Sequence, residues 1–172
     1  MLAALVAVLL VRSDVEAVES YKKTLSTFEA LAHRVQKVHT WRGVDFYDDS
    51  KATNVGAVAM ALASFDRPVI LIAGGRDKQG DYAPLKGLVH HKVKKLFLLG
   101  EAKWAIEKVL KDQTAIELVE DMKEAVQKSV EIAQENDVVL LSPACSSYDQ
   151  YRNYKERGDD FAKWAHYFCE KT

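Results

Sequence analysis

The sequence predicts an α/β protein: a Rossmann-like three-layer domain with a largely parallel sheet and one antiparallel edge strand. From residue 35 onward, short apolar segments alternate with helical segments of about ten residues, a pattern typical of βαβ units. The segment 68–73 (PVILIA) is apolar throughout, as expected for a strand covered on both faces. Trp41-Arg42-Gly43 separates two β-prone segments and predicts a tight hairpin at one edge of the sheet.

The individual elements follow from the same alternation. Strands are predicted at 35–40, 44–48, 68–73, 95–99, 115–119 and 137–142. Helices are predicted at 54–64, 82–89, 101–111 and 121–135, followed by two terminal helices at 149–157 and 159–167 with a break at Gly158. Thr53 or Asn54 is expected to cap the first of these helices and Asp121 the fourth, because their side chains accept hydrogen bonds from first-turn N–H groups.

The residues before the first strand read as helical. Residues 1–11 (MLAALVAVLLV) are too short for a membrane span and lack the basic region and cleavage site of a signal peptide. A buried helix remains, and because no capping residue precedes it, Met1 is interpreted as a cut inside an older helix. Ser13 and Glu16 form a capping box for a second helix at about 15–25. We therefore expect two parts, 1–34 and 35–172.

Composition excludes several classes of partner. The net charge is −1 with both signs mixed along the chain, so neither nucleic acid nor an anionic membrane is expected to bind. The two cysteines, Cys145 and Cys169, form neither a metal-binding spacing nor a disulfide framework, which favours a reducing, cytoplasmic setting. The histidines show no metal spacing either, and no metal ligands are predicted. Cys145 is interpreted as a small loop residue rather than a nucleophile, since no histidine lies near it in sequence.

Three polar loops follow strands that should end at the same edge of the sheet, where open α/β sheets bind ligands. Residues 48–54 (DDSKATN) offer carboxylates, hydroxyls, an amide and one lysine, a set that suits a phosphorylated or carboxylated small molecule. In the second loop, Gly74 and Gly75 allow close backbone approach and Lys78 can meet an anion. A glycine turn with solvated charges explains that loop equally well.

The third loop, 142–149 (SPACSSYD), is expected to enter a helix N-terminus, whose free N–H groups and serines form a carboxylate cradle. An ordinary serine-capped helix is the open alternative. The phosphate-binding G-x-x-x-x-G-K-[ST] and G-x-G-x-x-G motifs and the hydrolase G-x-S-x-G elbow are all absent from the sequence. The loops therefore predict a small-molecule site without identifying the reaction.

Taken together, four motifs resemble the Mur ligases: H-R at 33–34, D-S-K-A-T-N at 49–54, G-G-x-x-K at 74–78 and S-P-A-C-S-S-x-D-Q-Y-x-N-Y-x-x-R-G-x-x-F at 142–161. The resemblance is to the C-terminal domain of the branch that adds D-glutamate to UDP-N-acetylmuramoyl-L-alanine in peptidoglycan synthesis. It implies an enzyme of three domains, which hold the UDP-sugar, ATP with Mg²⁺, and D-glutamate. Residues 1–34 would then be the last helices of the central ATPase domain.

The resemblance also implies the chemistry. ATP converts the substrate carboxylate to an acyl phosphate, which the amine of D-glutamate attacks. Lys51 matches a catalytic lysine near that centre, and Thr53 and Lys78 match residues that hold the carboxylates of the amino acid. The P-loop motif G-x-x-x-x-G-K-[ST] is absent from this sequence, so ATP and Mg²⁺ are expected to bind the full enzyme and not to bind this chain tightly. The other domains of the enzyme are expected partners of this chain.

The remaining matches lie on two sides of the predicted site. Ser147 and Tyr154 match the opposite wall of the amino-acid pocket, and Tyr148 is also assigned to substrate binding. Arg34 and Asp49 match contacts to the nucleotide. Two alternatives stay open: a catalytically silent Rossmann-like binding module, and a domain like that of folylpolyglutamate synthetase, which has no reason to carry D-S-K-A-T-N and S-P-A-C together.

Overall fold

The computed structural model describes Lys23 and residues 31–171. The chain divides between Leu31 and Ala32 into two compact units, and every element described below belongs to the second. Apart from Lys23, the helices predicted at 1–11 and 15–25 lie outside the described residues.

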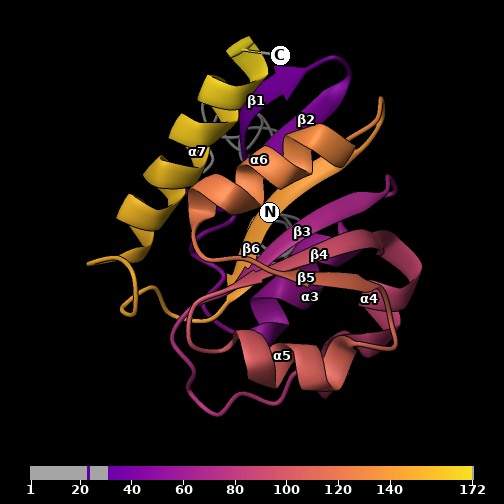
Figure 1. Cartoon of the computed structure of the whole chain (residues 1–172), viewed down its shortest axis with the longest axis vertical. Coiled ribbons are helices and arrows are strands. Elements are labelled where there is room, and N and C mark those ends of the chain that lie inside the picture. The colour runs from indigo at the N-terminus through magenta and orange to yellow at the C-terminus, as the bar shows by residue number, and fades with distance from the viewer. Residues whose placement is uncertain (1–22, 24–30, 172) are drawn as a thin grey trace, which may run out of the picture. The chain divides into compact units, whose positions relative to one another are not determined.

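The second unit is built on one sheet. Among the described residues, six strands pair in the order β1-β2-β6-β3-β4-β5 (Figure 1). The strands are β1 (Gln36–Trp41), β2 (Val44–Asp48), β3 (Val69–Gly74), β4 (Val93–Leu99), β5 (Ala115–Leu118) and β6 (Val138–Ala144). β1 runs antiparallel to β2, and the other neighbouring pairs are parallel. The predicted sheet with its antiparallel edge strand is confirmed.

Helices cover both faces of this sheet, as the apolar strands predicted. They are α3 (Val55–Ala63), the 3₁₀ helix η1 (Ala83–Leu85), α4 (Lys86–Lys92), α5 (Lys103–Leu110), α6 (Met122–Ile132) and α7 (Tyr154–Lys171). α3, α4 and α5 lie on one side and α6 and α7 on the other (Figure 1). No helix in the described part of the chain is long and apolar enough to cross a membrane.

Side chains of β3 pack alternately into two separate hydrophobic cores, because successive residues of a strand point to opposite faces of the sheet. Leu71 joins the cluster under α3, α4 and α5, whereas Ile70 and Ile72 join the cluster under α6 and α7. With both faces of the sheet buried under apolar side chains, polar groups are displaced to its edges and to the ends of its strands.

The hairpin between β1 and β2 confirms the predicted turn. Arg42 and Gly43 form its two-residue loop, with positive φ of 47° and 77° respectively, between the paired residues Trp41 and Val44. Two consecutive positive φ values match the twist of the flanking strands, and glycine supplies the second at low cost. The hairpin places β2 inside the sheet, beside β6.

The terminal helix differs from its prediction. One continuous helix, α7, replaces the two predicted helices, so the break at Gly158 is wrong. The helix also begins at Tyr154 rather than near 149, because the side chain of Asn153 accepts the backbone N–H groups of Lys155 and Glu156, each at 3.0 Å. An N-cap residue followed three positions later by glutamate was the sequence signal for this start.

Gly158 is explained by packing rather than by helix termination. A Cβ atom built at this position would clash with the Asp48 carboxylate and the His33 ring. Glycine therefore lets α7 approach the carboxyl end of β2 closely. Helix propensity alone cannot reveal this, because the contacts come from residues more than a hundred positions earlier in the chain.

We expect Gly158→Ala to lower the free energy of unfolding by about 1–3 kcal/mol, because overpacking outweighs the gain in helix propensity. Urea unfolding followed by circular dichroism measures the change. Gly87→Ala in α4 is the matched control, since a Cβ there meets no atom within 4 Å. That variant should be more stable than wild type by about 0.5–1 kcal/mol. Equal stabilisation by both substitutions would contradict the packing explanation.

Candidate functional site

The three polar loops meet at one edge of the sheet, as predicted. β6 lies between β2 and β3 and runs parallel to both, so the loops that follow these strands are neighbours. We call 49–54 the first loop, 74–80 the second loop and 142–149 the third loop. The carboxyl edge of the sheet is thus the candidate site.

Backbone hydrogen bonds join these loops directly. The Asp49 N–H donates to Leu141 O at 2.8 Å, which ties the first loop to the end of β6. The Arg76 N–H donates to Ser146 O at 2.9 Å and ties the second loop to the third. Both bonds involve main-chain atoms, so the edge has a defined geometry before any side chain is considered.

A cavity of about 140 Å³ opens between the loops. Thr53 of the first loop and Lys78 of the second both line it, so the structure brings together the two residues predicted to hold substrate carboxylates. Arg76, Tyr82 and Cys145 also line the cavity. The cavity thus combines a hydroxyl and two cationic side chains with a less polar interior.

Arg76 is a functional candidate that the sequence reasoning missed, although it lies two residues from Lys78 in the same charged loop. Its Nε is 4.0 Å from Glu101 Oε2, and both side chains are 56% exposed, so this ion pair is weak. Lys78 forms no ion pair with any carboxylate in the part of the chain that the structure describes. Both cations are therefore open to an external anion.

Two uncharged side chains form the inner wall of the cavity, and one of them, Tyr82, also donates its hydroxyl to Asp77 Oδ1 at 3.4 Å. The Tyr82 hydroxyl and the Cys145 Sγ share a hydrogen bond of 3.3 Å, and both residues are buried. Burial raises the pKa of both groups above their ordinary values. A thiol kept neutral in this way is a poor nucleophile, which agrees with the structural interpretation of Cys145.

Lys51 lies apart from this cavity, beside Tyr154. The Lys51 Nζ is 5.2 Å from the centre of the Tyr154 ring, and the same ring meets the His33 ring edge-on at 5.8 Å. Among the described residues, no carboxylate lies within ion-pairing distance of Lys51. Tyr154, predicted to line the amino-acid pocket, instead packs against Lys51 and is absent from the cavity wall.

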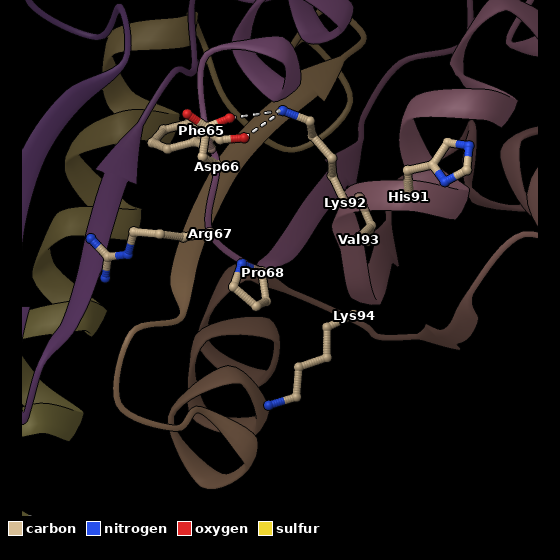
Figure 2. A pocket seen from close by; sticks show the side chains of 8 residues that line it. All are labelled: Phe65, Asp66, Arg67, Pro68, His91, Lys92, Val93 and Lys94. Atoms are coloured by element: carbon tan, nitrogen blue, oxygen red, sulfur yellow. Dashed lines mark hydrogen bonds and ion pairs between the residues drawn. The ribbon is translucent and has the colours of Figure 1, made fainter.

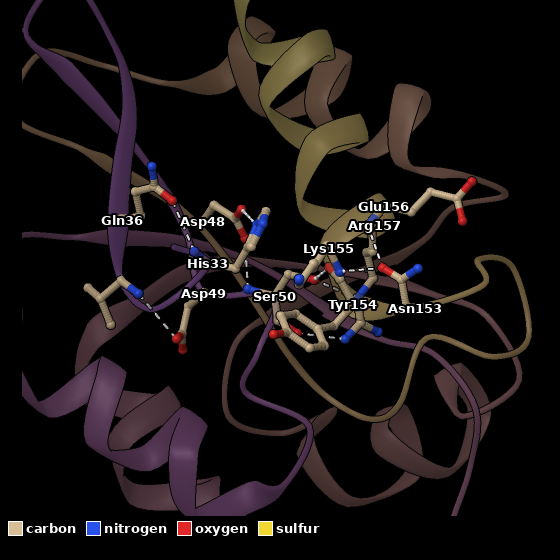
Figure 3. Close-up of polar contacts among 11 residues, drawn as sticks. His33, Gln36, Asp48, Asp49, Ser50, Asn153, Tyr154, Lys155, Glu156 and Arg157 are labelled. Atoms are coloured by element: carbon tan, nitrogen blue, oxygen red, sulfur yellow. Dashed lines mark hydrogen bonds and ion pairs between the residues drawn. The ribbon is translucent and has the colours of Figure 1, made fainter. Parts of the chain in front are cut away.

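The buried acid at the end of β2 holds the start of the domain. Asp48 and His33 share a hydrogen bond of 2.6 Å between Oδ2 and Nδ1, and Asp48 Oδ1 accepts the Ser50 N–H at 2.8 Å (Figure 3). Asp48 is 1% exposed, and burial raises the pKa of its carboxyl although both hydrogen bonds oppose the shift. This acid therefore orients the first loop rather than facing a ligand.

Asp49 is also turned inward. Its Oδ2 accepts the Ser142 hydroxyl at 2.7 Å and its Oδ1 accepts the Val35 N–H at 3.3 Å. Burial raises its pKa, while the nearby charge of Arg34 opposes that rise. Arg34 itself is exposed. Of the two residues matched to nucleotide contacts, only Arg34 thus presents its side chain to solvent.

The third loop departs from its prediction. Because α7 begins at Tyr154, no helix N-terminus follows Asp149, and the predicted cradle of helical N–H groups is wrong. Instead, Ser147 O accepts the N–H groups of Gln150 and Tyr151 in a tight turn. Tyr148 is 63% exposed and lines a separate surface hollow, so the structure does not bring it to the cavity of Thr53 and Lys78.

A larger hollow, of about 400 Å³, lies at the opposite edge of the sheet, near the amino ends of β3 and β4 (Figure 2). Its cations are already engaged within the protein. Arg67 pairs with Asp45, Lys92 donates to Phe65 O, and Lys94 pairs with Asp137 at 2.8 Å. Its charges therefore serve the fold. In the part of the chain that the structure describes, no cluster of His, Cys, Asp and Glu side chains could hold a metal.

Comparisons with known proteins agree with this arrangement. The family described as "Mur ligase, glutamate ligase domain" matches residues 33–145. The UDP-N-acetylmuramoylalanine–D-glutamate ligase of Salinibacter ruber is 50% identical over 143 residues, which cover 83% of this chain and 31% of that protein. The chain spans about a third of the length of the curated relatives it matches.

Solved structures share the fold at low sequence identity. The UDP-N-acetylmuramate–alanine ligase MurC of Thermotoga maritima has a TM-score of 0.58 and 17% identity, and the match covers 90% of this chain and 36% of that one. The bifunctional folylpolyglutamate synthase/dihydrofolate synthase of Yersinia pestis has a TM-score of 0.51 and 18% identity, over 83% of this chain and 32% of that one. At such identities these structures show the fold alone.

The raised pKa of Asp48 has a consequence for stability. An acid whose pKa is raised by folding binds its proton more tightly in the folded state than in the unfolded state. Its contribution to the free energy of unfolding is therefore complete below the ordinary pKa near 4, and it is lost as the pH rises through the raised pKa. Asp48→Asn cannot titrate. We therefore expect its free energy of unfolding to rise relative to wild type as the pH increases from about 4, by at most about 1.4 kcal/mol per pH unit. Urea unfolding across this range measures the difference, and parallel pH curves would contradict the assignment.

Proposed function

Because this chain belongs to the Mur ligase family and carries its glutamate ligase domain, we propose that it is the D-glutamate-binding part of an ATP-dependent amide ligase. The reaction proposed is the addition of D-glutamate to UDP-N-acetylmuramoyl-L-alanine in peptidoglycan synthesis. The observation that carries this proposal is the cavity in which Thr53, Arg76 and Lys78 converge. Two free, buried cysteines are compatible with a cytoplasmic enzyme.

The lining of the cavity suits a small dicarboxylate. D-glutamate carries two carboxylates at neutral pH, and Lys78 and Arg76 provide one cation for each. Charge-assisted hydrogen bonds of this kind are the strong ones, and an arginine can bind a carboxylate through two parallel N–H groups. The Thr53 hydroxyl adds a donor, and the Tyr82 and Cys145 side chains of the wall carry no charge of their own.

Lys51 is assigned to the chemical step. In the proposed reaction the alanine carboxylate becomes an acyl phosphate, the D-glutamate amine attacks its carbonyl carbon, an amide forms, and inorganic phosphate leaves. Negative charge gathers on the phosphoryl and carbonyl oxygens along this path, and a fixed cation beside them stabilises the transition state. Lys51 fits this role because no carboxylate of the described chain neutralises it and the Tyr154 ring holds it in place.

The other substrates are proposed to bind mainly to domains outside this chain. ATP and Mg²⁺ would be held there, with Arg34 as the contact that this chain supplies to the nucleotide. Asp49 is proposed to act at the same place through the lone pairs that Ser142 and Val35 leave free. Residues 1–34 are proposed to be the end of the ATPase domain, since the family match begins close to that boundary, at residue 33.

Two alternative functions can be distinguished from this proposal by experiment. A silent binding module would keep the cavity without supporting the reaction, and a domain like that of folylpolyglutamate synthetase would bind glutamate without preferring the D enantiomer. The relative from Salinibacter ruber, a D-glutamate ligase at 50% identity, favours the first proposal over both.

D-Glutamate should shift the amide NMR signals of Thr53, Lys78 and Cys145 when titrated into the chain. We expect Lys78→Ala and Arg76→Ala each to weaken its binding by roughly tenfold or more, because each removes a charge-assisted hydrogen bond. Lys86→Ala, at an exposed position on α4, is the matched control and should bind as wild type does.

Ligand controls separate the alternatives in the same titration. D-Glutamine lacks one carboxylate and should bind more weakly than D-glutamate to the wild-type chain. Equal binding of L-glutamate would favour the folylpolyglutamate synthetase-like alternative. Wild-type affinity in Lys78→Ala would refute the assignment of the cavity to the amino acid.

The role of Lys51 can be measured in a chimera that joins residues 33–172 to the preceding part of the Salinibacter ruber relative. Provided that the parent chimera turns over, Lys51→Ala should lower kcat by at least about a hundredfold, the usual cost of losing one transition-state charge contact. The KM for D-glutamate should change little, because Lys51 lies outside the cavity. Lys155→Ala, an exposed lysine nearby, should have no effect, and an active Lys51→Ala chimera would exclude the catalytic role.

A further inference from the structure

A buried guanidinium lies against all three loops of the candidate site. Arg157, in the first turn of α7, is 2% exposed. Its Nε donates to Ser50 Oγ at 3.0 Å, and its Nη2 donates to Ser50 O at 2.9 Å and to Cys145 O at 3.0 Å. Figure 3 shows Arg157 beside Ser50 at the start of α7. One side chain therefore ties the first loop to the third.

The second loop passes against the same group. A Cβ atom added to Gly75 would lie 3.0 Å from Arg157 Nη1 and would clash with Ser146 O. Gly75 also has a φ of 133°, which side chains rarely tolerate. Bare glycine backbone is thus required where the second loop crosses the guanidinium. Arg157 is in contact with, or packed closely against, each of the three loops.

Packing alone does not explain a charge at this position. All three of its hydrogen bonds go to a hydroxyl or to carbonyl groups, and its Nη1 donates to no acceptor in the described residues. Burial lowers the pKa of Arg157 to about 10, so the group stays protonated at neutral pH. No carboxylate of the described residues pairs directly with Arg157, although the nearby charges of Asp149 and Asp48 favour its protonated form. A buried cation without a direct ion pair still costs stability, and an apolar residue of similar size would avoid that cost.

The contacts of Arg157 lead to the proposed catalytic lysine. Ser50, which accepts from Arg157, donates its hydroxyl to Tyr154 O at 2.6 Å. The Tyr154 ring in turn lies 5.2 Å from Lys51 Nζ. Ser50 directly precedes Lys51 in the chain, so the guanidinium constrains this lysine from two sides, through the backbone and through the ring.

We infer that Arg157 is a positioning residue of the ligand site: it sets the spacing of the first and third loops, and thereby the position of Lys51 and Thr53 relative to the cavity wall at Cys145. This inference rests on the proposed function for its ligand, D-glutamate. Arg157 is not among the residues that line the cavity, although it donates to the main chain of Cys145, which does line it. It acts through Ser50 and Cys145, whose main-chain carbonyls it holds together.

Arginine is required for this task, and lysine cannot replace it. The guanidinium is a rigid planar fork with five N–H donors, which can hold acceptors in several fixed directions at once. A lysine ammonium retains the charge but sits on a flexible stem. Arg157→Lys therefore separates the geometric role from the charge.

A first measurement needs no ligand. Amide hydrogen exchange is compared in wild type, Arg157→Lys and the control Arg152→Lys. The Arg152 side chain is exposed on the surface and, among the residues that the structure describes, pairs only with Glu156. We expect exchange at the amides of Ser50, Lys51 and Arg76 to accelerate at least tenfold in Arg157→Lys, with the amides of β3 unchanged. Arg152→Lys should exchange as wild type does.

A second measurement uses D-glutamate as the probe, by NMR titration at a temperature where the near-ultraviolet circular dichroism shows each variant folded. Arg157→Lys should weaken binding at least tenfold and Arg152→Lys less than twofold. Ser50→Ala, which deletes only the hydroxyl, is the second variant and carries the same test if Arg157→Lys does not fold. The effects of Ser50→Ala and Arg157→Lys should be non-additive in the double variant.

The outcomes are distinct. A folded Arg157→Lys, or failing that Ser50→Ala, with wild-type loop exchange and D-glutamate affinity within twofold would overturn the inference. If the wild-type chain does not bind D-glutamate, the proposed function fails, but the exchange experiment still decides whether Arg157 positions the loops. Uniformly faster exchange across the core, with unchanged affinity, would show a purely structural role and would also overturn the inference.

Discussion

The parallel placement of β6 between β2 and β3 is the constraint on which the rest of the structure depends. It brings the ends of three strands, far apart in sequence, to adjacent positions at one edge. Because both faces of the sheet are buried under apolar side chains, the polar groups that follow these strands lie at its carboxyl edge. The location of the candidate site is thus a consequence of strand order.

Charges at this edge are divided into two groups. Asp48 and Asp49 are buried with their oxygens bound by protein donors, and Arg157 is buried against main-chain carbonyls. These groups hold the loops and present little charge to a ligand. Lys51 and Lys78 stay free of carboxylate partners within the described chain. The edge therefore offers cations to an incoming anion, although the chain as a whole has a net charge of −1.

The family was correctly predicted from its motifs, and the match over residues 33–145 confirms it. The motifs could do this because D-S-K-A-T-N and S-P-A-C-S-S lie in loops whose residues contact one another at the carboxyl edge of the sheet. The low identity of the solved structures shows, by contrast, that the same fold tolerates very different sequences. The features that distinguish this site are therefore in its loops rather than in its sheet.

The amino-acid sequence by itself determined the strands, the hairpin at Arg42-Gly43, the Asp121 cap and the three loops, because each depends on local periodicity or turn chemistry. Only the tertiary structure decided the continuity of α7 through Gly158, the placement of Tyr154 against Lys51 and the role of Arg157. Those features depend on contacts between distant segments; Arg157 and Ser50, for example, are 107 positions apart. Local propensity cannot predict such a contact, because the contact forms only after the sheet has brought the two segments together.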